Sequence, residues 1–220
     1  MKKNIVVIGA SGHSKVIIDI LEKSENWNIL GYLDSFKKEL SFFGYPILGT
    51  EKDLSFLLKD LDIFGGVIAI GDNWTRFKMV QKIKNISPKF QFISAIHPSA
   101  ILGKGVEIGY GSVIMAGAIL NPDAKIGFHS IINTSSIIEH DSQIGNFSTI
   151  SPNVAMGGNV KIGDFSTIGI GATLKHGVQI SDDVVIGATS VVLNNIQQNS
   201  IAYGIPAKII RARKRSESYL

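Results

Sequence analysis

Residues 131–168 read IINTSSIIEHDSQIGNFSTISPNVAMGGNVKIGDFSTI, and an apolar side chain stands at every sixth position of this stretch. The same period continues on both sides, so that sixteen consecutive sixth positions are apolar: Leu102, Ile108, Ile114, Leu120, Ile126, Ile132, Ile138, Ile144, Ile150, Met156, Ile162, Ile168, Leu174, Ile180, Ile186 and Val192. Two residues before each of them stands Ala, Ser or Val. A period of six fits neither an amphipathic helix nor a simple alternating strand, and it is typical of a β-solenoid.

The period also predicts the geometry of the solenoid. Each repeat forms one short strand and one corner, and three repeats complete one triangular coil. The large aliphatic side chains point into the prism, and successive coils stack at about the 4.8 Å spacing of paired strands. Residues three repeats apart therefore lie in one column, which predicts that Pro122, His140, Gly158 and His176 are stacked at one corner.

The first ninety residues follow a different pattern. Residues 3–8 form a β-branched run, and further strands are expected at 29–33, 67–70 and 90–93. Residues 15–23, 51–59 and 75–84 have helical spacing. Strands that alternate with helices predict an α/β domain with a small parallel, Rossmann-like sheet over residues 1–96, followed by the solenoid over residues 97–220. His97-Pro98 marks the boundary, because the sixfold period begins there.

The segment Gly9-Ala-Ser-Gly12 follows the first predicted strand, where a parallel sheet binds phosphate through backbone N–H groups and a helix N-terminus. A full dinucleotide fingerprint needs a third glycine near Ser14, so a tight structural turn is the alternative. Asp34 ends the second strand and is expected either to contact a ribose or base or to cap a turn. Gly71 and Asn73 end a later strand at the same edge of the sheet, which favours a ligand that carries a nucleotide.

Composition excludes several classes of function. The chain has no cysteine, which excludes disulfides, thiolate metal sites and a cysteine nucleophile. Its net charge of +4 is concentrated near the C-terminus in Lys208, Arg211, Arg213, Lys214 and Arg215; without them 17 basic residues face 18 acidic ones, so nucleic-acid binding is not indicated. No apolar run approaches the roughly 20 residues of a membrane span, and no signal-peptide cleavage site follows the basic start. We therefore expect a cytoplasmic protein.

Several segments together resemble one family. Gly9-Ala-Ser-Gly-His-Ser-Lys-Val16, Ile68-Ala-Ile-Gly-Asp-Asn73 with Arg76, and Asn133-Thr-Ser-Ser-Ile-Ile-Glu-His-Asp141 look like the bacterial hexapeptide-repeat sugar acetyltransferases, as does Gly204-Ile-Pro-Ala-Lys208 followed by Arg211. That family includes N-acetyltransferases of nucleotide-linked 4-amino-4,6-dideoxy sugars and sialic acid O-acetyltransferases. The resemblance implies a left-handed parallel β-helix, acetyl-CoA as co-substrate, no metal, and a homotrimer with sites between subunits.

The resemblance also assigns roles to residues. His140, flanked by acids at a predicted corner, would be the general base, and Asp141 would be its electrostatic partner. The substrate would be bound by Gly9, Ser11, Gly12, His13, Asp34, Gly71, Asn73, Arg76 and Asn133. Acetyl-CoA would be bound by Thr149, Gly158, Ile170, Gly187, Ala188, Lys208 and Arg211. No covalent acyl-enzyme is expected, because neither a cysteine nor a Ser–His–acid arrangement is evident.

Two positions of this scheme carry specific expectations. Gly158 has no side chain one coil from the base, which would leave room for the ligand and a bare N–H for the thioester oxygen; a structural Gly-Gly corner is the alternative. Thr149 stands where many relatives carry a second histidine, and it would supply a weaker hydrogen bond to the donor or substrate.

Three rival functions are open from the residues. O-acetylation of a sialic acid or related sugar is the alternative within the enzyme class, and a non-catalytic nucleotide-sugar-binding solenoid is the alternative outside it. A zinc carbonic anhydrase on the same fold needs a third histidine beside His140 and His176. Two coils would also hold these two histidines about 10 Å apart within one chain.

Overall fold

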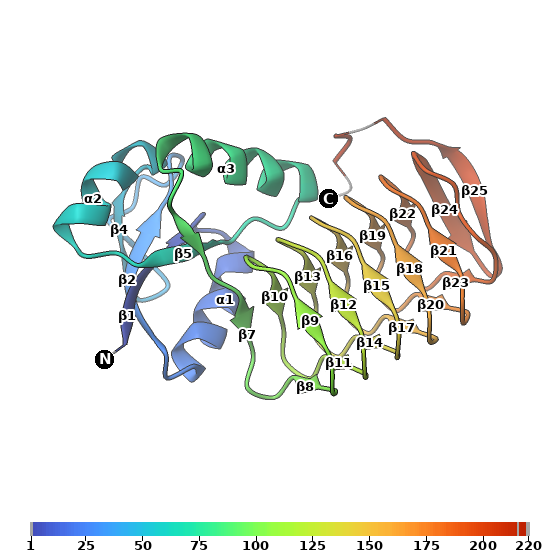
Figure 1. Ribbon diagram of the computed structural model, residues 1–220. Coiled ribbons are helices and arrows are strands. Elements are labelled where there is room, and N and C mark those ends of the chain that lie inside the picture. The colour runs from blue at the N-terminus through green and yellow to red at the C-terminus, as the bar shows by residue number, and fades with distance from the viewer. Residues whose placement is uncertain (1, 215, 219–220) are drawn as a thin grey trace.

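The computed structural model describes residues 2–214 and 216–218, so Arg215 of the basic C-terminal segment lies outside the described residues. The chain forms an α/β part and a long three-sided prism whose coils run from the α/β part to the C-terminal strands (Figure 1). No helix among the described residues combines the length and the apolar character that a membrane crossing requires.

The N-terminal part is built on a six-stranded sheet in the order β3-β4-β2-β1-β5-β6. Its strands are β1 (Lys3–Ile8), β2 (Trp27–Leu33), β3 (Ser41–Phe42), β4 (Tyr45–Gly49), β5 (Gly65–Ile68) and β6 (Gln91–Phe92). All pairings are parallel except β3 with β4. The sheet is thus parallel as expected except at this edge, where the turn at Phe43 and Gly44, both with positive φ, folds β3 back on β4.

Three helices cover this sheet: α1 (Gly12–Lys23), α2 (Leu54–Asp60), which a 3-10 turn at Glu51–Asp53 precedes, and α3 (Asn73–Ile86). At the start of α1, the Ser14 hydroxyl accepts from the Ser11 N–H at 3.0 Å and donates to the Ser11 carbonyl at 2.7 Å. Ile17, Ile20 and Leu21 of α1 are buried in a core that also contains Val113 and Ile131 of the prism. The helix therefore packs the two parts of the chain together.

The prism has three faces of parallel strands. Face A contains β7 (Ala95–Ile96), β10 (Val113–Ile114), β13 (Ile131–Ile132), β16 (Thr149–Ile150), β19 (Thr167–Ile168) and β22 (Val185–Ile186), and it ends in β24 (Ser200–Gly204) and β25 (Ala207–Ala212). Face B contains β8 (Ile101–Leu102), β11 (Ile119–Leu120), β14 (Ile137–Ile138), β17 (Ala155–Met156), β20 (Thr173–Leu174) and β23 (Val191–Val192). Face C contains β9 (Glu107–Ile108), β12 (Lys125–Ile126), β15 (Gln143–Ile144), β18 (Lys161–Ile162) and β21 (Gln179–Ile180).

The register confirms the predicted coil of three repeats. Ile114 pairs with Ile132, and Ile132 pairs with Ile150, and the other faces follow the same offset. Of the sixteen predicted inward positions, all described, fourteen are buried in one apolar core. Leu102 and Ile108 are more exposed because they belong to the first coil, which no earlier coil covers. The first strand of face A already begins at Ala95.

Serine is accepted at the small-residue positions because each buried hydroxyl finds partners in the neighbouring coil. Ser130 Oγ donates to the carbonyl of Gly145 at 2.7 Å and accepts from the N–H of Ser148 at 3.1 Å. Ser148 Oγ makes the same two bonds, to Gly163 and from Ser166. A buried hydroxyl without partners would be costly, and this ladder removes that cost.

An aromatic column joins the α/β part to the prism. His129, Phe147 and Phe165 stand in successive coils at the corner between faces C and A, and their rings stack with centroids 5.2 and 5.3 Å apart. Phe77 of α3 meets Phe147 and Phe165 edge-on. This packing places α3 along one edge of the prism (Figure 1).

Candidate active site

His140 lies at the corner between faces B and C, between the end of β14 and the start of β15. The backbone turns there at Asp141, whose φ is +60°, and this turn brings the Asp141 carboxylate beside the ring. His140 Nδ1 and Asp141 Oδ2 are 2.7 Å apart, and both side chains are more than half exposed. An ionised carboxylate only accepts, so Nδ1 carries the proton in the neutral ring and Nε2 presents its lone pair.

The electrostatics of this corner suit a base. The hydrogen bond to Asp141 raises the pKa of His140 above its ordinary value, and the negative charges of Asp141 and Glu139 act in the same direction. Because the ring is exposed, water screens these charges. The pair therefore strengthens the base and fixes its tautomer without adding measurably to stability.

The ring of His140 lies over Gly158 of the next coil. A Cβ atom on Gly158 would stand 2.5 Å from His140 Nε2, so the missing side chain makes room for the imidazole itself. Gly158 is buried as a result. The Gly158 N–H donates to no acceptor among the described residues, so the expected role of this N–H at the thioester oxygen stays a prediction, while the space of the missing side chain holds the His140 ring.

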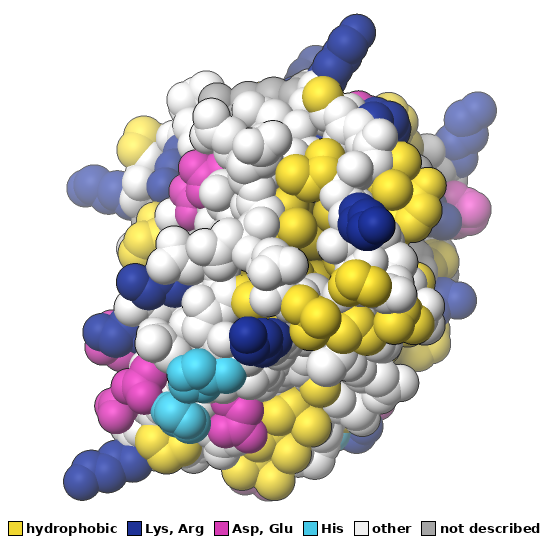
Figure 2. Space-filling view, turned by 90° about the vertical axis from the view of Figure 1, so that its right-hand side faces the viewer, with side chains coloured by type: hydrophobic (Ala, Val, Ile, Leu, Met, Phe, Trp, Pro, Cys, Tyr) yellow, Lys and Arg dark blue, Asp and Glu magenta, His cyan; other side chains and the backbone are white. Residues whose placement is uncertain are grey.

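His176 stands on the far side of Gly158 in the same column. The two ring centroids are only 6.3 Å apart. This is closer than the spacing of about 10 Å that two stacked coils predict, because the side chains lean toward each other over the glycine. Figure 2 shows histidine side chains together on the surface beside acidic ones. Both rings line a pocket of about 490 Å³ with Asp123, Asp141 and Lys161.

Metal binding is not indicated at this corner. Within the described part of the chain, no group of three or more His, Cys, Asp or Glu side chains is arranged to hold a metal ion. Among the described residues, His140 and His176 therefore lack the third side chain that a metal site at this corner would require.

Four other predicted prism residues, Asn133, Ile170, Gly187 and Ala188, lie at the opposite edge of face B. Asn133 precedes β14, whereas His140 follows it, and the Asn133 side-chain amide donates to the carbonyl of Ile150 at 3.0 Å. Ile170, Gly187 and Ala188 occupy the same corner two and three coils further on, and Ile170 is 56% exposed. One chain therefore carries these residues and His140 at two separate corners.

Three predicted ligand-binding residues are buried where the α/β part meets the prism. Arg76 is 1% exposed; its Nε donates to the His129 carbonyl at 2.8 Å, and its Nη2 donates to Asn73 Oδ1 at 2.7 Å. Thr149 Oγ1 donates to Asn73 Oδ1 at 2.7 Å. These side chains bond each other and the prism backbone, and the assignment of Asn73 and Arg76 to substrate and of Thr149 to acetyl-CoA stays a prediction.

The predicted nucleotide-binding residues lie around one edge of the N-terminal sheet. Asp34 Oδ2 accepts from the N–H of Ala10 at 2.7 Å, and Oδ1 accepts from Phe36 at 2.7 Å and from Lys37 at 3.0 Å. Asp34 thus caps a turn, as the alternative expectation held. Asp34 and Ser11 also line an open pocket of about 500 Å³ with Ala10, Phe36 and Lys37.

The glycines and His13 at this edge have distinct surroundings. Gly9 has a φ of +99° and forms the turn that follows β1. Gly71 lies in the turn after β5, where its carbonyl accepts a hydrogen bond from Arg76 Nη1 at 2.6 Å. Gly12 and His13 open α1, whose first N–H groups have no acceptor within the helix. The His13 Nε2 atom is buried without a hydrogen-bond partner, and burial, followed by the charge of Arg76, lowers the pKa of His13 to about 4.

The predicted phosphate-binding side chains lie on β25. Lys208 is exposed there, whereas Arg211 forms a paired contact with Glu217, at 2.5 Å from Nη2 to Oε1 and 3.2 Å from Nη1 to Oε2. This contact lowers the pKa of Glu217 to about 2. A CoA phosphate would have to displace Glu217 to reach Arg211, so Lys208 is the more accessible of the two.

The predicted column placed His176 two coils from His140 but did not predict how closely their rings approach each other. The residue that could have indicated this approach is Gly158, which lies between the two histidines in the column. Coil spacing describes Cα positions, whereas a glycine in the middle position lets two long side chains converge. The distance between the His140 and His176 rings therefore depends on the direction of the two side chains, which the repeat does not encode.

Comparison with known proteins agrees with this geometry. Residues 4–83 match the family described as PglD N-terminal domain, and residues 159–194 match the bacterial transferase hexapeptide (six repeats). The structure of perosamine N-acetyltransferase from Caulobacter crescentus in complex with CoA and GDP-perosamine is 33% identical, and the match covers 94% of this chain and 96% of that chain with a TM-score of 0.88. The acetyltransferase domain of PglB from Neisseria gonorrhoeae in complex with acetyl coenzyme A is 30% identical, covers 96% and 100%, and has a TM-score of 0.85.

A curated relative points the same way. UDP-N-acetylbacillosamine N-acetyltransferase of Bacillus subtilis is 36% identical over 119 residues, which is about half the length of each protein (52%). The prism of repeats and the surface His–Asp pair define a hexapeptide-repeat acyltransferase. More narrowly, the chain belongs to the PglD-type family of hexapeptide-repeat sugar N-acetyltransferases.

Proposed function

We propose that this protein transfers the acetyl group of acetyl-CoA to the 4-amino group of a nucleotide-linked 4-amino-4,6-dideoxy sugar, with His140 as general base. The observation that carries the proposal is the His140–Asp141 contact of 2.7 Å at a solvent-facing corner. It occurs in a chain that matches, over nearly its whole length, an N-acetyltransferase bound to CoA and GDP-perosamine. We propose that the protein acts in the cytoplasm.

The reaction is a direct transfer. The lone pair of the sugar amine attacks the carbonyl carbon of the thioester, so the C–N bond forms and the C–S bond breaks. His140 Nε2 accepts the proton that the nitrogen loses, and Asp141 stabilises the resulting imidazolium through Nδ1–H. The electron pair of the C–S bond leaves with the CoA sulfur, which is released as the thiol after it takes up a proton.

The acceptor would be held by the α/β part of the chain. The pocket beside Ser11 and Asp34 contains an exposed aromatic ring, Phe36, and the cation Lys37 at its edge. A ring and a cation suit a base and a phosphate. Gly12 and His13 add the N-terminus of α1, where an anion is stabilised. These features support a nucleotide at this edge.

The acetyl donor would lie between two copies of the chain. His140 and the expected pantetheine path through Ile170, Gly187 and Ala188 lie at opposite edges of face B, so a second copy must bring them together. The outward positions of face B support such an interface, because they are mainly apolar: Ile101, Ile119, Ile137, Ala155, Thr173 and Val191. We propose a cyclic homotrimer in which the B faces turn toward the symmetry axis.

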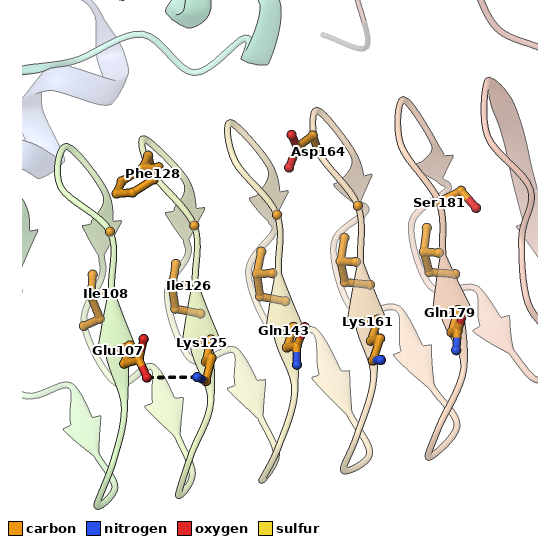
Figure 3. Close-up of a pocket in the computed structure, with 17 residues that line it drawn as sticks. Glu107, Ile108, Lys125, Ile126, Phe128, Gln143, Lys161, Asp164, Gln179 and Ser181 are labelled. Atoms are coloured by element: carbon orange, nitrogen blue, oxygen red, sulfur yellow. Dashed lines mark ion pairs between the residues drawn. The ribbon is translucent and has the colours of Figure 1, made fainter.

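Face C has the opposite character. Its outward positions are polar, namely Glu107, Lys125, Gln143, Lys161 and Gln179, and they border a groove of about 570 Å³ (Figure 3). The Glu107–Lys125 ion pair of 2.9 Å is exposed and contributes little to stability. The two faces therefore differ as a subunit interface differs from a solvated surface.

The test is thiol release from acetyl-CoA against a panel of acceptors: UDP-, dTDP- and GDP-linked 4-amino-4,6-dideoxy sugars, and free and CMP-linked sialic acid. The chain has no cysteine, so a thiol reagent detects product alone. We expect release with an amino sugar nucleotide and a loss of about 10²-fold or more in kcat for His140→Ala. Release with sialic acids alone would replace N-acetylation by O-acetylation, and silence with every acceptor would contradict the proposal.

A further inference from the structure

We propose that Glu51 is a positioning residue for the acceptor: its buried carboxylate holds the loop of residues 34–38, whose Phe36 and Lys37 line the pocket proposed for the nucleotide. The inference rests on the proposed function and adds a residue that lines neither this pocket nor that of the base. Glu51 opens the 3-10 turn Glu51–Asp53 that precedes α2.

The Glu51 carboxylate lies in the interior of the α/β part. The residue is 1% exposed, and its Oε2 atom accepts from Lys82 Nζ at 2.7 Å. Oε2 also accepts from the Ser35 hydroxyl, and Oε1 accepts from the Ser35 N–H at 3.3 Å. Burial alone would raise the pKa of Glu51, but the hydrogen bonds from Lys82 and Ser35 outweigh it and hold this pKa below its usual value. The group is therefore a buried anion whose lost hydration these two residues replace.

The loop that follows β2 is held by two carboxylates. Asp34 accepts from the N–H groups of Phe36 and Lys37, and Glu51 accepts from the N–H and the hydroxyl of Ser35. Three consecutive backbone donors are thereby bonded to carboxylate oxygens. Asp34 belongs to the loop itself, whereas Glu51 belongs to another element, so the bonds of Glu51 fix the loop against the rest of the α/β part.

These bonds fix the wall of the pocket before any ligand binds. Phe36 is 90% exposed, so its ring has little packing of its own to hold it. Lys37 Nζ lies 4.3 Å from the centroid of the Phe42 ring on β3. A binding loop that is already ordered lowers the entropic cost of binding. We therefore expect Glu51 to increase the affinity for the nucleotide without changing the transfer step.

The second partner of Glu51 connects the loop to the prism. Lys82 lies on α3, the same helix as Arg76, whose guanidinium donates to prism carbonyl groups. A continuous series of contacts thus runs from the prism through α3 to Glu51 and on to Ser35. The nucleotide pocket is in this way held at a fixed place relative to the prism.

Nucleotide binding tests this role without any need for turnover. Titration calorimetry with UDP, dTDP and GDP identifies the nucleotide that the wild type binds, and each variant is then titrated with it. Ser35→Ala removes the hydroxyl that Glu51 holds, and Glu51→Ala removes the carboxylate. We expect Kd to rise about fivefold in the first variant and about tenfold in the second.

Two further variants serve as controls. Ser35→Thr keeps the hydroxyl and should bind the nucleotide as the wild type does. Ser55→Ala removes another exposed hydroxyl of the α/β part, which donates to the Ile86 carbonyl at 3.1 Å, and should also leave Kd unchanged. Ser35→Ala leaves the contact between Glu51 and Lys82 in place, so it tests the loop in a protein whose buried ion pair is intact.

Kinetic constants separate positioning from general damage to the fold. With an amino sugar nucleotide as acceptor, KM for the acceptor should rise in Ser35→Ala and Glu51→Ala as Kd does. The kcat at saturating acceptor and the KM for acetyl-CoA should stay those of the wild type. A fold that is loosened as a whole would change all three constants.

The contrary outcomes are distinct. Ser35→Ala and Glu51→Ala proteins that bind the nucleotide as tightly as the wild type would overturn the role of Glu51 and leave the proposed function intact. A Ser35→Thr protein as impaired as Ser35→Ala would also overturn it, because the hydroxyl would then not matter. A wild type that binds none of the three nucleotides and releases no thiol would contradict the proposed function and this inference together.

Discussion

At the scale of single residues, the proposed catalysis depends on the contact between His140 Nδ1 and Asp141 Oδ2. The carboxylate sits beside the ring because Asp141 adopts a φ of +60°, a conformation that Asp and Asn tolerate better than most residues. The corner of the coil and the tautomer of the base are thus set by the same residue.

Replacing Asp141 with Asn should move the pH dependence of the reaction. The base must be neutral to act, so kcat/KM rises with pH through the pKa of His140. The hydrogen bond to Asp141 raises that pKa, and its loss should shift the midpoint of the rise to lower pH. The plateau should fall about 10-fold or more, because the weaker partner orients the ring less well. A pH–rate profile with an unchanged midpoint would count against Asp141 as the partner of the base.

Single residues also mark where sequence reasoning reached its limit. His140 and Asp141 could be predicted because the repeat places them at a corner and the family pattern surrounds them. The contacts of Asn73, Arg76 and Thr149 could not be predicted, because a polar residue at the end of a strand can face a ligand or another part of the chain. Only the packing of α3 against the prism decides between the two, and neither periodicity nor spacing describes it.

At the scale of secondary-structure elements, the contact between α3 and the prism determines how the α/β part and the prism are placed relative to each other. Arg76 of α3 donates to carbonyl groups of both parts of the chain, including Gly71 at 2.6 Å and Phe147 at 3.1 Å. The aromatic column of His129, Phe147 and Phe165 packs beside it. The sequence shows α3 as a helix but gives no indication of what it contacts.

Replacing Arg76 with Met should destabilise the fold without altering the chemistry. Several buried carbonyl and amide oxygens would lose their donors, which we expect to lower the free energy of unfolding by about 3 kcal/mol. Folded enzyme should keep the KM of the wild type for the acceptor. Urea unfolding measures the first quantity, with Lys78→Met, at an exposed position of the same helix, as the control. A large rise in KM at unchanged stability would restore Arg76 to the substrate site.

His129 makes the aromatic column sensitive to acid. Burial, followed by the charges of Arg76 and Lys84, lowers the pKa of His129 to about 3, whereas the unfolded chain has the ordinary value of 6.5. The unfolded state therefore binds the extra proton between these values, and this contribution to stability, complete above pH 6.5, is lost as the pH falls toward 3. From pH 7 to 5 the loss is about 2 kcal/mol for this one group.

His129→Phe should remove that part of the acid sensitivity, since it extends the column of Phe147 and Phe165 with a ring that does not titrate. Unfolding in urea at pH 7 and at pH 5 tests this, and the variant should lose less stability over the interval than the wild type. His13, whose pKa is also lowered, remains in both proteins and contributes equally to each. Equal losses in the two proteins would contradict the account of His129.

At the scale of the whole molecule, the period of six accounts for the prism and for its core, because every sixth residue must be apolar for any coil to be buried. It also encodes the difference between the faces, since the outward positions of face B are mainly apolar and those of face C are polar. The period does not predict how the α/β part is placed on the prism or how copies of the chain meet. Both depend on contacts that the sixfold repeat does not describe.

The apolar outward column of face B predicts the effect of a charge there. Ile137→Glu should dissociate the assembly and abolish acetyl transfer, because burying an unpaired carboxylate in an interface is costly. The monomer should remain folded, since this side chain points out of the prism. Gln143→Glu, at the matching position of face C, should leave both assembly and activity intact. Light scattering gives the mass of each, and an active Ile137→Glu monomer would contradict the shared site.

The account predicts that acetyl transfer occurs where His140 of one chain meets the CoA path of the next, and mixed trimers test this most directly. His140→Asn and Ala188→Trp chains, each inactive alone, would be co-expressed with different tags and purified through both. Every trimer that contains both chains has one site with an intact base and an intact path, so thiol release should recover to about one third of the wild-type rate. Mixed trimers as inactive as their parents would show that each site belongs to a single chain and would contradict the account.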